Sequence, residues 1–137
     1  MSRRKIQSVP CVDGETAQER SLADRFLART RKDLVRLRTI IERARHGDRS
    51  ALTEAGRVSH SIHGAGAMLG FSDIGTAGGR IERLTGIVMA RSASGGSTLW
   101  AVSLQQLSES TEDLARALEA ARQTASGSAG MFQRQEA

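Results

Sequence analysis

The chain has 137 residues, of which 39% are apolar, so it can form the core of one compact domain but not of two. Aromatic residues make up only 3% and there is a single proline, a composition that favours an all-α domain over a sheet. The formal net charge of +5 raises nucleic acid as a partner, but the few scattered aromatic residues offer no platform for base stacking, and we expect no nucleic-acid binding.

The N-terminal segment, residues 1–16, lacks periodicity and contains Pro10 and Gly14, so we expect a flexible tail. Its basic tip precedes no long apolar segment, which makes it a poor signal peptide. No apolar run approaches the roughly 20 residues that a membrane span needs. Cys11 is the only cysteine and has no internal disulfide partner. These features predict a cytoplasmic protein without a membrane partner.

Four stretches have apolar residues at steps of three and four, the spacing that aligns them on one side of a helix. The stretches are 17–46, 50–71, 72–90 and 97–123. The residues predicted to face the core are Leu22, Phe26, Thr30, Leu34, Leu37, Ile41 and Ala44, then Leu52, Ala55, Val58, Ile62, Ala65 and Leu69, then Ile74, Ala77, Ile81, Leu84 and Val88, and finally Trp100, Leu104, Leu107, Thr111, Leu114 and Leu118. Because the connections are short, we expect an antiparallel four-helix bundle over 17–123.

The ends of these helices carry capping signals. Gly47 fits the left-handed C-cap of the first helix, and Asp48 or Ser50 can cap the second. The sequence "RSASGGS" is typical of a loop, after which Ser97 or Thr98 can cap the last helix. The last helix is expected to end near Gln123, and residues 124–137 to form a flexible C-terminal tail.

Two histidines stand close together in "VSHSIHGAGAMLG", a stretch that also holds three glycines. Glycine is about 1 kcal/mol less favourable than alanine in a helix interior, so its presence needs a reason. On a helix, the neighbours of His60 on its own face are Gly56, His63, Gly64 and Ala67. We therefore expect His60 to project toward solvent among small residues that let a partner approach.

Four interpretations of this face remain open at this stage. The histidines are exposed without a chemical role, ligate a metal, serve a Ser-His hydrolase, or act as a phosphoryl-accepting nucleophile. A metal site needs further ligands, and none falls at ligand spacing beside the pair, so we expect no metal in this chain. A hydrolase needs an acid and an oxyanion hole, and Ser59 and Ser61 adjoin His60 without facing it along the helix.

The sequence "HSIHGAGAMLG" resembles the signature of histidine phosphotransfer (HPt) domains of two-component phosphorelays. In that family the phosphoryl-accepting histidine is followed by any residue, an aliphatic residue, usually a lysine, and a glycine. The matching positions here are His60 as acceptor, Ile62 and Gly64, whereas His63 stands where the lysine is usual. The similarity extends over about residues 20–120, includes "RIERL" in the third helix, and implies a four-helix bundle.

The resemblance implies a relay. A response-regulator receiver domain with a phosphorylated aspartate docks on the histidine face, His60 accepts the phosphoryl group, and a further receiver takes it on. A hybrid histidine kinase is a further expected partner. The receiver is expected to bring Mg²⁺, so no cofactor is expected in this chain. Since the chain is too short for a kinase ATP-binding domain, we expect a phosphoryl carrier that does not phosphorylate itself. We also expect it to be a monomer. The alternative is a non-catalytic helical adaptor that binds a receiver or kinase.

Several residues are candidates for roles beside the acceptor. We expect His63 to stabilise the phosphoryl group by a hydrogen bond, or else to be a tolerated exposed residue. The candidate docking residues are Gly56, Arg57, Gly64, Ala67 and Phe71. For Phe71 the alternative is that it closes the end of the bundle. Residues 18–46 hold eight arginines and one lysine against four acidic residues, an excess that suits either an acidic receiver surface or an ordinary solvated face.

Overall fold

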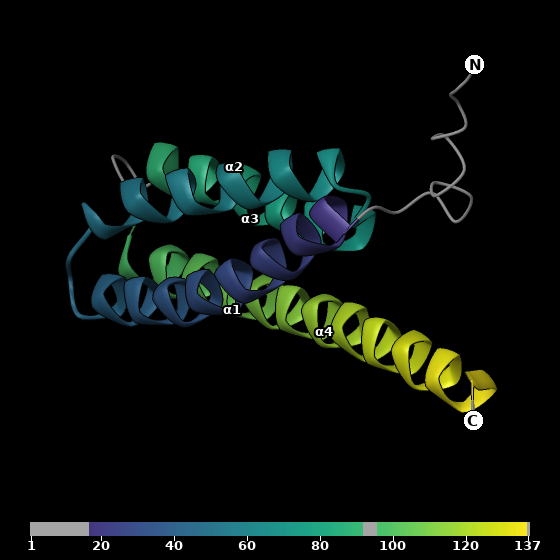
Figure 1. Cartoon of the computed structure of the whole chain (residues 1–137). Helices are drawn as coiled ribbons and strands as arrows, with labels where there is room; N and C mark the ends of the chain where they lie inside the picture. Colours follow the sequence, from purple (N-terminus) through teal and green to yellow (C-terminus); the bar gives the residue numbers. More distant parts are fainter. Residues whose placement is uncertain (1–16, 92–95, 137) are drawn as a thin grey trace, which may run out of the picture.

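The computed structural model describes residues 17–91 and 96–136, and they form four helices (Figure 1). The helices are α1 (Ala17–Arg45), α2 (Ala51–Met68), α3 (Ser72–Arg91) and α4 (Ser97–Glu136). Each helix packs against the next one in the chain, and α4 also packs against α1. The predicted all-α four-helix bundle is confirmed. The predicted N-terminal tail, and the middle of the predicted loop at 92–95, lie outside the described residues.

The core lies between the apolar sides of the four helices. The predicted core residues that the structure buries are Phe26, Thr30, Leu34, Leu37, Ile41 and Ala44 in α1, Leu52, Ala55, Val58 and Ile62 in α2, Ile74, Ala77, Ile81 and Val88 in α3, and Leu104, Leu107, Thr111, Leu114 and Leu118 in α4. Ala65, Leu84 and Trp100 are partly buried against them. Helical periodicity therefore predicted most of the core, because one face of each helix is covered.

Two predicted core residues are instead exposed. Leu22 lies one turn before Phe26, the first buried residue of α1, and is 42% exposed. Leu69 is 39% exposed because α2 ends at Met68, earlier than predicted. The chain then leaves the helix through Gly70, whose φ of +86° lies in the left-handed region.

The turn between α1 and α2 confirms one predicted cap and corrects another. Gly47 has a φ of +103°, the left-handed conformation expected after a helix end. Ser50 occupies the N-cap position of α2, but its side chain makes no capping hydrogen bond. Its hydroxyl donates instead to the Asp48 carboxylate, which also accepts from Arg43. Of the two residues predicted to cap α2, Ser50 therefore does not cap it, whereas the Asp48 carboxylate accepts from the backbone N–H of Ala51, the first residue of the helix.

The predicted end of the last helix is wrong, since α4 continues from Gln123 to Glu136 and extends beyond the other helices (Figure 1). No proline interrupts this part of the sequence. The Thr124 hydroxyl donates to the Ala120 carbonyl 3.0 Å away, a contact within the helix itself. The helix continues through Gly127 and Gly130, which weaken a helix but do not block its backbone hydrogen bonds as proline would, although the bundle core ends earlier.

Glycines allow α2 and α3 to pack closely. A Cβ atom placed on Gly66 of α2 would lie 2.8 Å from the Cα and N atoms of Gly75 in α3. A Cβ atom on Gly78 of α3 would lie 2.9 Å from the Ile62 side chain and 3.0 Å from the His63 backbone N. Atoms do not approach so closely in proteins, so this helix crossing requires glycine at these positions. Part of the glycine content of the histidine stretch thus serves packing.

We predict that Gly66→Ala lowers the free energy of unfolding by about 1–3 kcal/mol, because the added methyl group forces α2 and α3 apart. Gly64→Ala is the matched control in the same helix, since a Cβ atom there meets nothing within 4 Å. The control is expected to leave stability unchanged or to raise it by up to about 1 kcal/mol. Urea denaturation of both variants measures the difference. Equal stabilities would contradict the packing role of Gly66.

Candidate functional site

His60 projects from the middle of α2, and its side chain is 74% exposed. Its predicted exposure is confirmed. Gly64, one turn later, has open space where a side chain would begin, and Ala67 is exposed. Gly56, one turn earlier, is partly buried, because a Cβ atom there would touch the Thr85 methyl group at 3.7 Å. The open side of His60 therefore extends toward the C-terminal end of α2.

A carboxylate from α3 contacts both histidines. The Oε2 atom of Glu82 lies 2.7 Å from Nδ1 of His60, and its Oε1 atom lies 3.4 Å from Nδ1 of His63. An ionised carboxylate only accepts hydrogen bonds, so Nδ1 of His60 carries the proton that it donates to Glu82. The lone pair of the neutral imidazole then resides on Nε2, the other ring nitrogen.

The sequence did not single out Glu82 as a site residue. It is part of "RIERL", the segment that resembles the family in the third helix, but no spacing rule relates it to His60 22 positions earlier. Its position one residue after the buried Ile81 placed it at the edge of the core-facing stripe. Which side chain Glu82 contacts is determined only by the distance between α2 and α3 and by their rotation relative to each other.

The histidines hold Glu82 in its ionised form. Its side chain is 34% exposed. Burial by itself would raise the pKa of Glu82, but the hydrogen bonds from His60 and His63, and their charge when protonated, leave that pKa below its ordinary value. The carboxylate is therefore ionised at neutral pH and accepts hydrogen bonds there.

The second imidazole lies against the backbone of α3. His63 has a side chain that is 52% exposed. A Cβ atom placed on Gly79 would lie 3.2 Å from the Cγ, Cδ2 and Cε1 atoms of the His63 ring. Three ring atoms at one distance show that the face of the ring covers Gly79. The glycine thus leaves the space that this imidazole occupies.

The predicted docking residues differ in their surroundings. Arg57 is exposed and forms no ion pair with any residue in the described ranges. Phe71 is partly buried, and its ring stacks on Phe26 with a centroid separation of 5.3 Å. This contact supports the alternative that Phe71 closes the end of the bundle.

Arginines of α1, whose excess charge suits either an acidic receiver surface or an ordinary solvated face, are engaged within the protein. Three of them pair with acidic residues at short range: Arg36 with Glu54 at 2.6 Å, Arg38 with Glu112 at 2.7 Å and Arg43 with Asp48 at 2.9 Å. The Arg38 pair is bidentate and joins α1 to α4. These pairs favour the interpretation that this half of α1 is a charged surface engaged within the protein.

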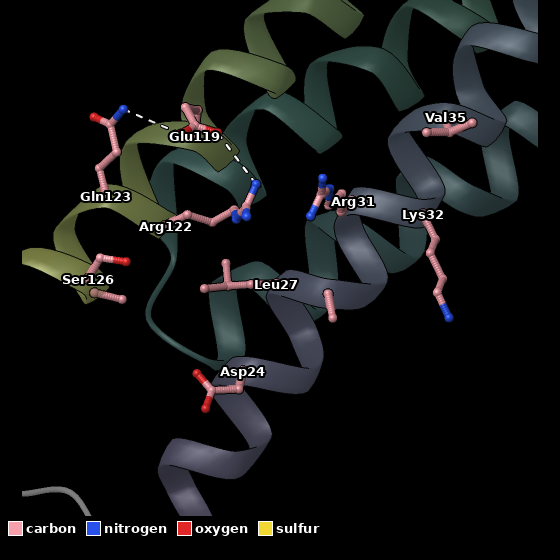
Figure 2. Close-up of a pocket in the computed structure, with 11 residues that line it drawn as sticks. Asp24, Leu27, Arg31, Lys32, Val35, Glu119, Arg122, Gln123 and Ser126 are labelled. Atoms are coloured by element: carbon pink, nitrogen blue, oxygen red, sulfur yellow. Dashed lines mark hydrogen bonds and ion pairs between the residues drawn. The ribbon is translucent and has the colours of Figure 1, made fainter. Parts of the chain in front are cut away.

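A groove of about 800 Å³ lies between α1 and α4, and the histidines take no part in it (Figure 2). Leu27 and Arg31 line it from α1, and Arg122 lines it from α4. Arg122 pairs with Glu119 in its own helix, as the dashed line in Figure 2 marks. The groove combines apolar and mixed-charge groups and shares no residue with the His60 site.

In 17–91 and 96–136, no group of three or more histidine, cysteine, aspartate or glutamate side chains is arranged to hold a metal ion. Within the same residues, no helix has the length and apolar character required to cross a membrane.

Comparison with known proteins places the whole bundle in one family. The family model of the Hpt domain matches residues 21–124, which is more than half of the chain and includes His60, His63 and Glu82. No curated protein and no solved structure matches the chain. The matched range begins in α1 and ends in α4, so it spans all four helices. By this match the protein belongs to the Hpt domain family, whose members act in histidine phosphotransfer within phosphorelays.

Proposed function

We propose that this protein accepts a phosphoryl group on Nε2 of His60 from the phospho-aspartate of a receiver domain and transfers it to another receiver. The observation that carries the proposal is the exposed His60 imidazole, whose Nδ1 binds Glu82 at 2.7 Å. With Nδ1 protonated, the nucleophilic nitrogen is the one not engaged by Glu82. Gly64 and Ala67 leave room beside it for the docked receiver.

The transfer itself needs little from this chain beyond position and charge. The Nε2 lone pair attacks phosphorus while the bond between phosphorus and the aspartyl oxygen breaks, and the receiver's aspartate leaves as a carboxylate. The imidazole then carries a positive charge, because Nδ1 keeps its proton. Glu82 compensates this charge through the same hydrogen bond. Return of the phosphoryl group to a second aspartate reverses these changes.

The receiver is proposed to bring the remaining groups. Phosphoryl transfer depends mainly on positioning and on stabilising the charge of the phosphoryl oxygens. Mg²⁺ bound to the receiver supplies part of that charge, and His63 adds a hydrogen-bond donor from this protein when both of its ring nitrogens are protonated, since Nδ1 faces Glu82. Arg57, exposed one turn before His60, is the arginine best placed to meet an acidic receiver surface.

A helical adaptor without phosphotransfer is the second candidate. One observation favours it. His63 stands where the family usually has a lysine, and its ring contacts Glu82 within this protein. An adaptor would bind a receiver through the same face and leave His60 unmodified.

We predict that phosphorylated receiver domains from the same organism label the protein with phosphate that is labile in acid and stable in base. His60→Gln is expected to abolish the label, because the accepting nitrogen is lost from this face. His46→Gln is the matched control, since His46 is exposed after the end of α1 and its ring contacts the Glu42 carbonyl. Label on the His60→Gln protein would contradict the acceptor assignment. Absence of label on the unsubstituted protein, with binding retained, would favour the adaptor.

We also predict that Glu82→Gln slows phosphoryl transfer to His60 by about 10–100-fold, by analogy with the loss of the carboxylate partner of a metal-ligating histidine. The amide neither compensates the positive charge on the ring nor fixes the proton at Nδ1. Rapid-quench measurement of a single transfer gives the rate.

Glu112→Gln is the control for this substitution. Glu112 also accepts from a cationic side chain between two helices, but its partner is Arg38 and it lies away from the histidines. If the two variants transfer phosphate at the same rate, Glu82 does not act on His60.

A further inference from the structure

We propose that His63 is a positioning residue, seated on Gly79, which fixes the Glu82 carboxylate and through it the imidazole of His60. The inference rests on the proposed function of His60, and it assigns His63 a task that precedes arrival of the phosphoryl group. It identifies Gly79 as the residue that makes this arrangement possible.

The first step is the contact between the His63 ring and Gly79. The His63 ring lies face-on to Gly79, 3.2 Å from where a Cβ atom would stand. Next to it in α3, Gly78 brings the backbone of α2 close at the His63 N atom. The ring is therefore confined between its own helix and α3, although its side chain is 52% exposed. A Cβ atom at position 79 would be in unusually tight contact with the ring, which would have to shift by a few tenths of an ångström.

The second step is the carboxylate. The terminal torsion of a glutamate side chain is broad, so one hydrogen bond does not fix the plane of the carboxylate. In Glu82 the two oxygens have different partners, Oε2 with His60 and Oε1 with His63. The contact with His63 is the longer one at 3.4 Å, yet it restrains the oxygen that His60 does not use. With both oxygens engaged, rotation of the carboxylate loses both contacts.

The third step is the effect on His60. Nδ1 of His60 faces Glu82, and the orientation of that bond sets the direction of Nε2 and keeps the proton on Nδ1. Because Nδ1 of His63 faces Glu82 as well, its action on His60 passes through the carboxylate. A misdirected Nε2 is costly, since transfer requires alignment with the incoming phosphorus.

Two glycines of α3 provide the test. Gly79 and Gly86 lie one turn on either side of Glu82, and replacing either with alanine improves helix propensity equally. At Gly79 the new methyl group meets the His63 ring, whereas at Gly86 it meets nothing within 4 Å. Gly79→Ala is thus expected to shift the His63 ring by a few tenths of an ångström without changing any titratable side chain.

The first readout is the ¹⁵N chemical shifts of the His60 ring in the unphosphorylated protein, which report the fraction with the proton on Nδ1 and need no partner. We expect Gly79→Ala to lower this fraction and Gly86→Ala to leave it unchanged. The second readout is the transfer rate from a phosphorylated receiver, expected to fall on the order of tenfold in Gly79→Ala alone.

Substitution of His63 itself completes the experiment and does not depend on the folding of Gly79→Ala. His63→Leu removes the donor and is expected to shift the His60 tautomer as Gly79→Ala does. His63→Asn keeps an N–H donor at the same distance along the side chain as Nδ1 and is expected to restore much of the effect. If His63→Leu and Gly79→Ala both give the His60 spectrum of Gly86→Ala, the positioning role is overturned. Failure of the relay proposal appears differently, as absence of phosphate on the unsubstituted protein.

Discussion

The close crossing of α2 and α3 is the constraint on which the site depends. Packed helices with ordinary side chains at their contact are separated by about 8–10 Å. Here Gly66 contacts the backbone of Gly75, and Gly78 contacts Ile62 and the backbone of α2. Because glycine has no Cβ atom, the two helices can lie closer together at these positions. A glutamate on α3 can therefore reach an imidazole on α2 that itself points to solvent.

Glycine has several separate tasks in this chain, although each costs helix or backbone stability. Gly47 and Gly70 adopt positive φ angles where the chain leaves α1 and α2. Gly66 permits helix contact, Gly64 leaves the surface beside His60 open, and Gly79 receives the His63 ring. At Gly64 the space next to the backbone is open, and its role in admitting a partner stays a prediction. At Gly66 the reason is internal packing.

The arginines of α1 show that an excess of positive charge in the sequence does not by itself provide a surface for binding an acidic partner. Arg38 is engaged by both oxygens of Glu112 on α4, and Arg36 by Glu54 on α2. Exposed pairs of this kind contribute little stability, typically below about 1 kcal/mol each. Their effect is on the electrostatic field, because a paired arginine attracts an acidic partner less strongly than a free one. Arg57 is the contrasting case beside the histidine.

The sequence alone determined the features that depend on which side of a single helix a residue occupies. Steps of three and four predicted the four helices, most of the core and the outward direction of His60, because a residue's place around a helix follows from its number. The end of α4 was missed, since no proline or core contact marks where it stops. Only the tertiary structure decided that Glu82 binds both imidazoles and that His63 rests on Gly79. Those contacts join two helices, and the distance and rotation between helices are set by side-chain packing at their crossing, which no periodicity within one helix records.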